Sequence, residues 1–553
     1  MRRAFQWDLA RQVERLDFLL KWLPRYADWG YEELYLHIED AVEFPSLPGV
    51  ARPDAYSQTQ FAKLIEAATR VGIRVVPIIN LLGHTQYLIK EPGLRDLNEL
   101  RDENDRPLEH GQICPLHPRT LEVAETLLRD MAPFCTAGLV HVGLDESFHI
   151  GKCPRCRAEI ARAGLAAHFA GYIERLHAVT RQLGLRMGMW ADMFYYLPEA
   201  VARLPGDAIA YEWYYYPFRR RPRVELFNFA EADLASLFKK RGVEFYGCPM
   251  NGAFRWEPMP AFRERMENIL SWWHYGRRCG ANGFLVTSWE PSRLAIELTT
   301  AIDAAAACLW KNPEIRAPEK MIEIGFQRVF GAAGKSAAGV ALIADKFPFS
   351  GYARWQINDR WDVLATREPL KKHEREEQAL RALKKSAQKS PPALAASLRF
   401  RHYLAQRDLF VHAAAQRVFL ARRHAARGQT SAAIRVLGQA TRASEAFART
   451  LKPAQAAAGE MWRRSRDSRR SGPNAEMLAR DKLWLNKWRA WLRRAEKNIR
   501  VLNATTPVCG AWQLQFELLN LAPALQKVII EQQQADGAWH PLHGIFTVEF
   551  KSA

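Results

Sequence analysis

The sequence has few cysteines and no long hydrophobic run. Charged residues interrupt every apolar segment before it reaches the roughly 18 to 20 residues that a membrane-spanning helix needs. Asp8 follows the first residue too closely for the apolar part of a secretory signal, so we expect a cytoplasmic protein. The hydrophobic fraction of 48% and the charged fraction of 25% are typical of a folded globular chain and exclude a disordered or collagen-like one.

The 8 cysteines are too few and too scattered for a disulfide scaffold in 553 residues. Only Cys153 and Cys156 have the spacing of a metal-binding or redox pair. One such pair supplies two ligands where a structural zinc needs four, so we expect reduced thiols, no metal and no cofactor. The sequence nevertheless leaves open whether this pair binds a metal.

A GxGxxG motif is also missing, which argues against an open, doubly wound sheet that binds a dinucleotide. Instead, short apolar strands alternate with helical patterns eight times. The predicted strands span residues 5–8, 33–39, 73–80, 138–143, 185–190, 208–213, 243–246 and 283–288. The predicted helices include residues 13–29, 58–71, 121–134, 166–183, 225–241 and 260–277. Because each pair of parallel strands needs a crossover, this alternation predicts an α/β fold, a (β/α)8 TIM barrel.

The excess of positive charge is confined to one region. The net charge is +19, but residues 361–500 hold 32 of the basic and 12 of the acidic residues, which leaves 47 basic and 48 acidic residues elsewhere. Apolar positions such as Leu404, Phe410, Val411 and Ala414 recur there at helical spacing. We expect amphipathic helices with solvated basic faces and no bound nucleic acid, with a surface for phosphates as the alternative.

These patterns predict three regions. The barrel occupies residues 1–315, a mainly α-helical basic region follows in 316–503, and a short β-like tail covers 504–553. In the tail, Leu514 and Phe516 alternate with polar residues, and Asp536-Gly537 fits a hairpin turn. The apolar stripes of the helices need burial, which favours packing against the barrel, and a homodimer interface is the alternative.

Polar and aromatic residues follow nearly every predicted strand. In a TIM barrel the segments after the strands form one face, where catalytic groups lie. The residues at this face are Asp8, Arg11, Glu39, Asp40, Asn80, His84, Asp145, Glu146, Trp190, Asp192, Glu212, Trp213, Tyr246, Trp289 and Glu290. Carboxylates beside indoles favour carbohydrate chemistry, because the apolar faces of a pyranose stack on aromatic rings while its hydroxyls bind carboxylates and Arg.

Asp145 and Glu146 are the most informative pair in this set. They follow a strand that ends with His141-Val-Gly-Leu. Adjacent carboxylates in a shielded site repel each other, so we expect one of them to have a raised pKa and to act as a proton donor near neutral pH.

The segment from His141 to Glu146 resembles the His-x-Gly-Gly-Asp-Glu motif of glycoside hydrolase family 20, the β-N-acetylhexosaminidases, with Leu144 in place of the second glycine. Asp8-Leu-Ala-Arg11 resembles the segment after the first strand of that family. Gly83-His84 resembles the family's Pro-Gly-His element, with Leu82 in place of proline. The resemblance covers about residues 4–310 and includes the shorter, hexosaminidase D-like members.

The resemblance implies an exo-acting, retaining β-N-acetylhexosaminidase whose substrate, an amino-sugar glycan ending in β-GlcNAc or β-GalNAc, supplies its own nucleophile through the 2-acetamido oxygen. Glu146 would be the acid and base, and Asp145 would orient the acetamido group. Tyr246 would bind the acetamido oxygen, and either histidine would orient an acid. The substrate-binding residues so implied are Arg11, Asp40, His84, His141, Trp190, Asp192, Trp213, Tyr246, Trp289 and Glu290.

Two other functions fit the same residues. The barrel can be a catalytically inactive glycan-binding domain whose basic helices bind a partner. Alternatively, Glu146 and Glu290 can form the cross-site pair of another retaining glycosidase. A substrate without the 2-acetamido group distinguishes a glycosidase that uses Glu146 and Glu290 from a β-N-acetylhexosaminidase, because only the former would hydrolyse that substrate well.

Overall fold

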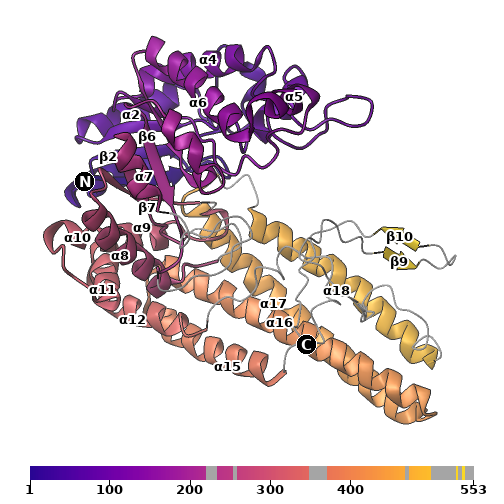
Figure 1. Ribbon diagram of the computed structural model, residues 1–553. Helices are drawn as coiled ribbons and strands as arrows, with labels where there is room; N and C mark the ends of the chain where they lie inside the picture. The colour runs from indigo at the N-terminus through magenta and orange to yellow at the C-terminus, as the bar shows by residue number, and fades with distance from the viewer. Residues whose placement is uncertain are drawn as a thin grey trace. The chain divides into compact units, whose positions relative to one another are not determined.

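The computed structural model describes residues 1–218, 233–252, 258–289, 291–347, 370–467, 472–499, 531–533 and 539–541. Eight parallel strands close into a barrel in chain order, which confirms the predicted fold (Figure 1). The strands are β1 (Arg2–Asp8), β2 (Glu33–His37), β3 (Arg74–Ile78), β4 (Leu139–His141), β5 (Arg186–Trp190), β6 (Ile209–Trp213), β7 (Glu244–Cys248) and β8 (Gly283–Val286). The ring closes where Arg2 of β1 lies opposite Gly283 of β8.

Helices cover the outside of the barrel (Figure 1). They are α1 (Leu16–Asp28), α2 (Gln58–Arg70), α3 (Gln86–Ile89), α4 (Thr120–Met131), α5 (Pro154–Ala163), α6 (Leu165–Gln182), α7 (Leu234–Arg241), α8 (Phe262–Cys279), α9 (Glu297–Ala306) and α10 (Cys308–Lys311). In α2, Ser57 and Gln60 form a capping box at the start, while Phe61, Leu64 and Ile65 are buried. Helical spacing of apolar residues therefore sets both the position of this helix and the face that it buries.

The crossover between β5 and β6 differs from the others. It contains the short 3-10 helices η4 (Asp192–Tyr195) and η5 (Pro198–Arg203) rather than an α-helix, and the sequence showed no long amphipathic pattern there. The other 3-10 helices are η1 (Pro48–Val50), η2 (Arg95–Leu97), η3 (Ala132–Phe134), η6 (Pro291–Arg293), η7 (Gly331–Ala333) and η8 (Ala387–Lys389).

The rest of the described chain is mainly helical, as predicted. Its helices are α11 (Pro318–Phe330), α12 (Gly334–Ala344), α15 (Leu370–Ser386), α16 (Pro392–Ala426), α17 (Thr430–Arg463) and α18 (Pro473–Lys497). In the tail, β9 (Glu531–Gln533) pairs antiparallel with β10 (Trp539–Pro541), while the other tail residues lie outside the described ones. No helix in the described ranges is long and apolar enough to cross a bilayer.

Contacts divide the chain into two compact units. One unit comprises Met1–Phe349, Glu376–Leu404 and Lys452–Glu476, and the other comprises Ser350–Arg375, Ala405–Leu451 and Met477–Ala553. The boundaries at residues 315 and 503 remain a prediction. Within the second unit, buried Arg407 of α16 binds Asp481 of α18 through two hydrogen bonds of 2.8 and 3.0 Å.

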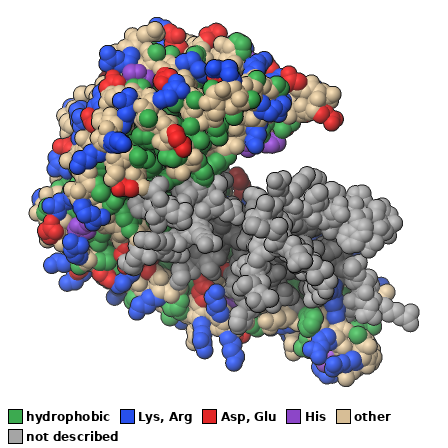
Figure 2. All heavy atoms as spheres, viewed as in Figure 1, with side chains coloured by type: hydrophobic (Ala, Val, Ile, Leu, Met, Phe, Trp, Pro, Cys, Tyr) green, Lys and Arg blue, Asp and Glu red, His purple; other side chains and the backbone are tan. Residues whose placement is uncertain are grey.

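Basic and acidic side chains are interspersed over the barrel surface (Figure 2). Examples are the exposed pair of Arg203 with Glu174 and that of Arg162 with Glu159. This mixture agrees with the near balance of charge outside residues 361–500. The described part of the barrel surface in this view therefore presents charges of both signs side by side.

Candidate active site

The segment after β4 makes a tight turn that carries the two adjacent acids. Gly143, Leu144 and Glu146 have positive φ angles of 71°, 78° and 48°. For leucine this conformation costs roughly 1 to 2 kcal/mol, while burying its side chain contributes about 1.5 to 3 kcal/mol. Leu144 is fully buried, so a leucine can stand where the His-x-Gly-Gly-Asp-Glu pattern has glycine. At Gly143, in contrast, a Cβ atom would lie 2.3 Å from Oδ1 of Asn80, which requires glycine.

His84 bridges the two acids. Its Nε2 atom lies 3.3 Å from Oδ2 of Asp145 and 3.1 Å from Oε2 of Glu146. The side chain of Asp145 is 11% exposed and that of Glu146 is 33% exposed. The other oxygen of Asp145, Oδ1, is buried and accepts no hydrogen bond from any described residue. One acid is therefore enclosed with a free acceptor atom, and the other reaches solvent.

The charges at this site depend on His84. Burial lowers the pKa of His84, but the carboxylates of Asp145 and Glu146 outweigh that effect and raise it well above its usual value. Burial alone would raise the pKa of Asp145, yet the charge and hydrogen bond of His84 hold it below its usual value. Asp145 is consequently an anion paired with an imidazolium. Adjacency to Glu146 therefore does not raise the pKa of Asp145, because the His84 cation lies beside it.

Asp192 is a nearby carboxyl whose pKa is raised well above its usual value. Burial is the main cause, and the charge of Asp145 adds to it. Oδ2 of Asp192 accepts the backbone N–H of Glu146 at 2.9 Å, and Oδ1 accepts the indole N–H of Trp213 at 3.4 Å. Asp192, which directly follows β5, thus joins the backbone of the acid segment to an aromatic residue at the end of β6.

A second polar network follows β1, β2 and β3. Arg11 donates to Glu39 at 2.6 Å, Asn80 donates to the other oxygen of Glu39 at 3.0 Å, and His37 lies 3.2 Å from that oxygen. Burial would raise the pKa of Glu39, but Arg11 and His37 lower it strongly. Burial lowers the pKa of His37, yet Asp8 and Glu39 raise it to about 9. The network holds the Arg11 guanidinium, which is 29% exposed, in a fixed position.

Aromatic rings connect the two networks. Trp190 packs edge-on against Trp289 at 5.4 Å, and Trp289 packs against His37 at 5.2 Å. Trp213 stacks on Tyr215 at 4.8 Å, and the Tyr215 hydroxyl accepts the Trp289 indole N–H at 2.6 Å. Trp213 and Trp289 are partly exposed, so they offer apolar ring surface beside the acids.

Comparison with known proteins agrees with this geometry. Residues 2–218 match the model of glycosyl hydrolase family 20, catalytic domain. This part of the chain is therefore similar to the catalytic domain of that family. The family 20 match ends just beyond β6 and covers the strands that carry Arg11, His84, Asp145, Glu146 and Trp213.

Individual relatives are distant. A beta-hexosaminidase of Vibrio furnissii is 23% identical over 310 residues, which are 46% of this chain and 48% of that protein. Hexosaminidase D of Bos taurus is 21% identical over 335 residues, which are 56% of this chain and 90% of that protein. The chitobiase of Flavobacterium johnsoniae is 16% identical, covers 79% of this chain and 75% of its own, and superposes with a TM-score of 0.46. The chain thus spans about half the length of the Vibrio furnissii relative.

The structure places three predicted residues differently from the sequence interpretation. The ring of Tyr246 lies inside the barrel, and its hydroxyl donates to Glu33 at the start of β2 and accepts from Arg2 at the start of β1. Tyr246 therefore faces the end opposite the acids, because its inward side chain extends toward the strand starts. This corrects its assignment to the acetamido oxygen.

Asp40 and His141 also differ from the prediction. The Asp40 carboxylate pairs with Lys90, and it is Glu39 that contacts Arg11. His141 is fully buried, and burial lowers its pKa to about 3, so it is a neutral ring packed on Trp190 at 4.4 Å. Its Nδ1 accepts the Gly143 N–H at 3.1 Å, and among the described residues only His84 of the two histidines bonds the acids. Glu290 lies outside the described residues.

Sequence reasoning missed Tyr215 and the contribution of His37. Tyr215 is two residues past the end of β6, in the run Trp213-Tyr-Tyr-Tyr216, and burial together with nearby charges, including that of Asp145, raises its pKa well above the usual value. The aromatic run was a usable signal, because residues just past a strand end face the site. His37 gave no such signal, since it lies within a predicted strand and not in the segment after it.

Proposed function

We propose that this chain is an exo-acting, retaining β-N-acetylhexosaminidase that removes terminal β-GlcNAc or β-GalNAc by substrate-assisted catalysis. The observation that supports this proposal best is the arrangement of Asp145, His84 and Glu146. In most retaining glycosidases, a carboxylate nucleophile and a carboxylic acid lie on opposite sides of the scissile bond. Asp145 and Glu146 both contact the same nitrogen of His84, so they are too close together to lie on opposite sides of that bond. The nucleophile is then the 2-acetamido oxygen of the substrate.

In the first step, the acetamido oxygen attacks C1 and the bond from C1 to the leaving oxygen breaks. Glu146 donates its proton to that leaving oxygen. The buried and unpartnered Oδ1 of Asp145 accepts the acetamido N–H, and its negative charge stabilises the positive charge that develops on the oxazolinium ring. His84 keeps Asp145 ionised for this purpose.

In the second step, water attacks C1 from the side that the aglycone has left. Glu146 accepts a proton from that water, and the bond from C1 to the acetamido oxygen breaks as the ring opens. The partial exposure of Glu146 allows both the leaving group and the water to reach it. Two inversions at C1 give net retention.

Sugar binding falls to the residues around the acids. Arg11, fixed by Glu39, binds ring hydroxyls, and the exposed ring surfaces of Trp213 and Trp289 pack on the sugar face. The hydroxyl of Tyr215 accepts the Trp289 indole N–H and donates a hydrogen bond to the acetamido oxygen, the role that the sequence had assigned to Tyr246. Holding the acetamido group against C1 makes the attack intramolecular and favours it entropically.

Chromogenic β-GlcNAc, β-GalNAc and β-glucose substrates test the proposal, with a thiazoline that mimics the cyclised intermediate as inhibitor. We expect hydrolysis of one or both amino sugars, inhibition by the thiazoline and little activity on β-glucose. Glu146→Gln should lower kcat/KM by about 10² to 10⁴-fold on a substrate with a poor leaving group. Asp145→Asn should lower it by about 10² to 10³-fold, because an amide cannot balance the positive charge.

Glu174→Gln, an exposed carboxyl of α6, is the matched control and should retain wild-type activity. Two results contradict the proposal: wild-type turnover by either active-site variant, or equal hydrolysis of the β-glucose substrate. The second result would instead favour a glycosidase whose nucleophile is a protein carboxylate such as Glu290. A protein that binds the sugars without hydrolysing them would be the inactive glycan-binding barrel.

A further inference from the structure

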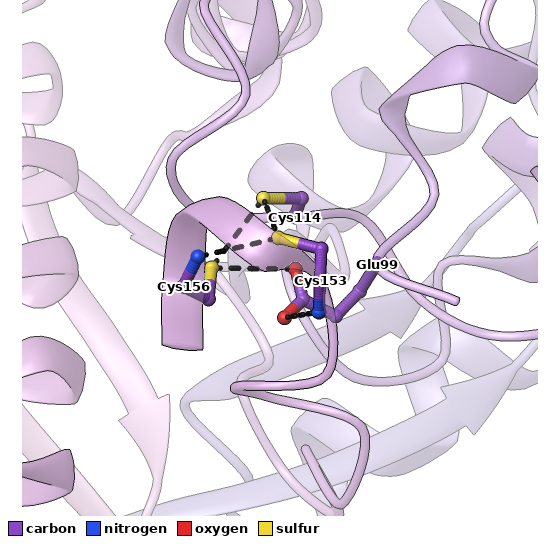
Figure 3. Close-up of side chains that lie close together, drawn as sticks. All are labelled: Glu99, Cys114, Cys153 and Cys156. Carbon is purple, nitrogen blue, oxygen red and sulfur yellow. Dashed lines mark hydrogen bonds between the residues drawn. The ribbon is translucent and has the colours of Figure 1, made fainter. Parts of the chain in front are cut away.

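Four side chains from two barrel segments meet in the interior beside the active-site loops. Glu99 and Cys114 belong to the segment between β3 and α4, and Cys153 and Cys156 belong to the start of α5. Figure 3 shows the three sulfur atoms and the Glu99 carboxylate turned toward one another. All four residues are at most 1% exposed. The Cys-x-x-Cys pair therefore has two further partners that the sequence did not indicate, because 39 residues separate Cys114 from Cys153.

The distances fit a tetrahedral metal site. Sγ of Cys114 lies 3.4 Å from Sγ of Cys153 and 3.5 Å from Sγ of Cys156, and Sγ of Cys156 lies 3.3 Å from Oε2 of Glu99. All four donor atoms lie within 4.8 Å of one another. Zinc bonds of about 2.3 Å to sulfur and about 2.0 Å to oxygen place tetrahedral ligands roughly 3.5 to 3.8 Å apart. The three separations quoted are slightly shorter than these values, so small shifts of the side chains bring the donor atoms to zinc-binding distances.

The buried negative charge of this cluster also favours a bound cation. The Glu99 carboxylate is buried, and its partners among the described residues are the backbone N–H groups of Lys152 and Cys153, at 2.7 and 3.1 Å, and the thiols of the cluster. None of these carries a positive charge that would offset the cost of burying a carboxylate. A divalent cation at the centre supplies that charge and binds the three thiolates at the same time.

A redox pair explains the cluster less well. Cysteines that exchange disulfides are accessible to a partner thiol, whereas these three are enclosed. Three thiols also leave one unpaired after any disulfide forms, and a disulfide leaves the Glu99 carboxylate buried without a counter-charge.

We propose that Glu99, Cys114, Cys153 and Cys156 bind one structural zinc ion. The four protein ligands leave no open position for water or substrate, so the ion has no role in the hydrolysis. The zinc ion joins the segment that carries His84 to the segment that carries Glu146. Glu146 lies seven residues before Cys153 in the sequence. Zinc binding thus holds together the two loops whose side chains meet at the active site.

Metal analysis of the purified, tag-free chain by inductively coupled plasma mass spectrometry tests the proposal. We expect about one zinc per chain after dialysis against metal-free buffer, and below one tenth of that amount in Cys153→Ser/Cys156→Ser. Cys135→Ser is the matched control, because Cys135 is buried but lies outside the cluster, and it should keep one zinc. Absence of zinc from the wild type, another metal in its place, or full zinc in the double variant would overturn the proposal.

Two measurements on the wild-type chain avoid dependence on the folding of the variants. Exchange with Co²⁺ should give the intense visible absorption of tetrahedral thiolate-bound cobalt, and its absence contradicts the site. Thiol titration in denaturant with a chelator should give all 8 cysteines as free thiols, whereas 6 would indicate a disulfide and overturn the proposal. None of these readouts requires hydrolase activity, so they remain decisive if the proposed function fails.

Discussion

One imidazole determines the charge of the carboxylates at the candidate active site. His84 lies within 3.3 Å of both acids, and the resulting attraction lowers the pKa of Asp145 and raises that of His84. These two pKa shifts make the stability of the folded protein depend on pH. The raised pKa of His84 contributes stability that is complete below its unfolded pKa of about 6.5 and is lost as the pH rises through the higher folded value. The lowered pKa of Asp145 contributes stability that is lost at acid pH.

His84→Gln should therefore change the pH dependence of catalysis. Without the cation, burial raises the pKa of Asp145, so the acidic limb of the kcat/KM profile should move to higher pH by about one unit or more. Activity at the optimum should also fall. His177→Gln is the control, because His177 pairs with Asp207 on the outside of the barrel and should leave the profile unchanged. An unshifted acidic limb in His84→Gln would show that His84 does not control Asp145.

Sequence could identify the acids but not their electrostatics. The pattern around His141 and Glu146 predicted an acid pair at the end of the fourth strand, and the geometry brings His84 to that pair. The sequence predicted a raised pKa for one of the two acids but could not show that His84 lowers that of Asp145, because the effect of a neighbouring cation depends on distances that sequence does not contain. The orientation of Tyr246 was equally hidden, since a strand position indicates an inward side chain but not which end of the barrel its hydroxyl reaches.

At the scale of elements, the segments after β3 and β4 approach closely enough to require glycine. A Cβ atom at Gly83 would lie 1.8 Å from the backbone oxygen of Asp145. The neighbouring His84 and Asp145 contact each other across this approach. Their geometry therefore depends on a close backbone contact between two loops, which a side chain on Gly83 would force apart.

Gly83→Ala should lower kcat/KM by about 10²-fold, because a displacement of about 1 Å at the site has a cost of that order. Gly206→Ala is the matched control, since a Cβ atom there has no neighbour within 4 Å, and it should change kcat/KM by less than about twofold. Full activity in Gly83→Ala would contradict the close approach.

The barrel elements were largely predictable, because short apolar strands and helical patterns alternate clearly along the first 310 residues. Every predicted strand overlaps an observed one, and α2 and α6 begin within one residue of the prediction. The junction between α17 and α18 coincides with Ser, Arg, Gly and Pro residues near 465–474, which interrupt a helical pattern. The partners of Cys153 and Cys156 were not predictable, because they come from a loop with no spacing signal of its own.

At the scale of the whole molecule, residues after α17 contribute to the unit that contains the barrel. Arg466 is 1% exposed and donates to Glu14 at 3.1 Å, to the Leu294 carbonyl at 3.0 Å and to the Pro291 carbonyl at 2.7 Å. Glu14 follows β1, and Pro291 follows β8. One guanidinium thus joins the segments that follow β1 and β8, which also carry Arg11 and Trp289.

Arg466→Met should destabilise the protein by about 3 to 5 kcal/mol, because it leaves the Glu14 carboxylate buried without a cation. Denaturant unfolding measures this loss, and Arg466→Met/Glu14→Met should recover much of it. Arg203→Met, which breaks an exposed pair, is the control and should cost at most about 1 kcal/mol. A loss in Arg466→Met no larger than that of the control would show that the pair does not hold these segments.

The role of the 2-acetamido group is the central claim, and kinetics with a series of substrates tests it most directly. Aryl β-GlcNAc derivatives with zero, one, two and three fluorine atoms on the acetyl methyl differ mainly in the nucleophilicity of the carbonyl oxygen. If that oxygen attacks C1, kcat/KM should fall steeply with each fluorine added, by orders of magnitude across the series. A rate independent of fluorination would mean that a protein carboxylate is the nucleophile and would contradict the assignment of Asp145 and Glu146.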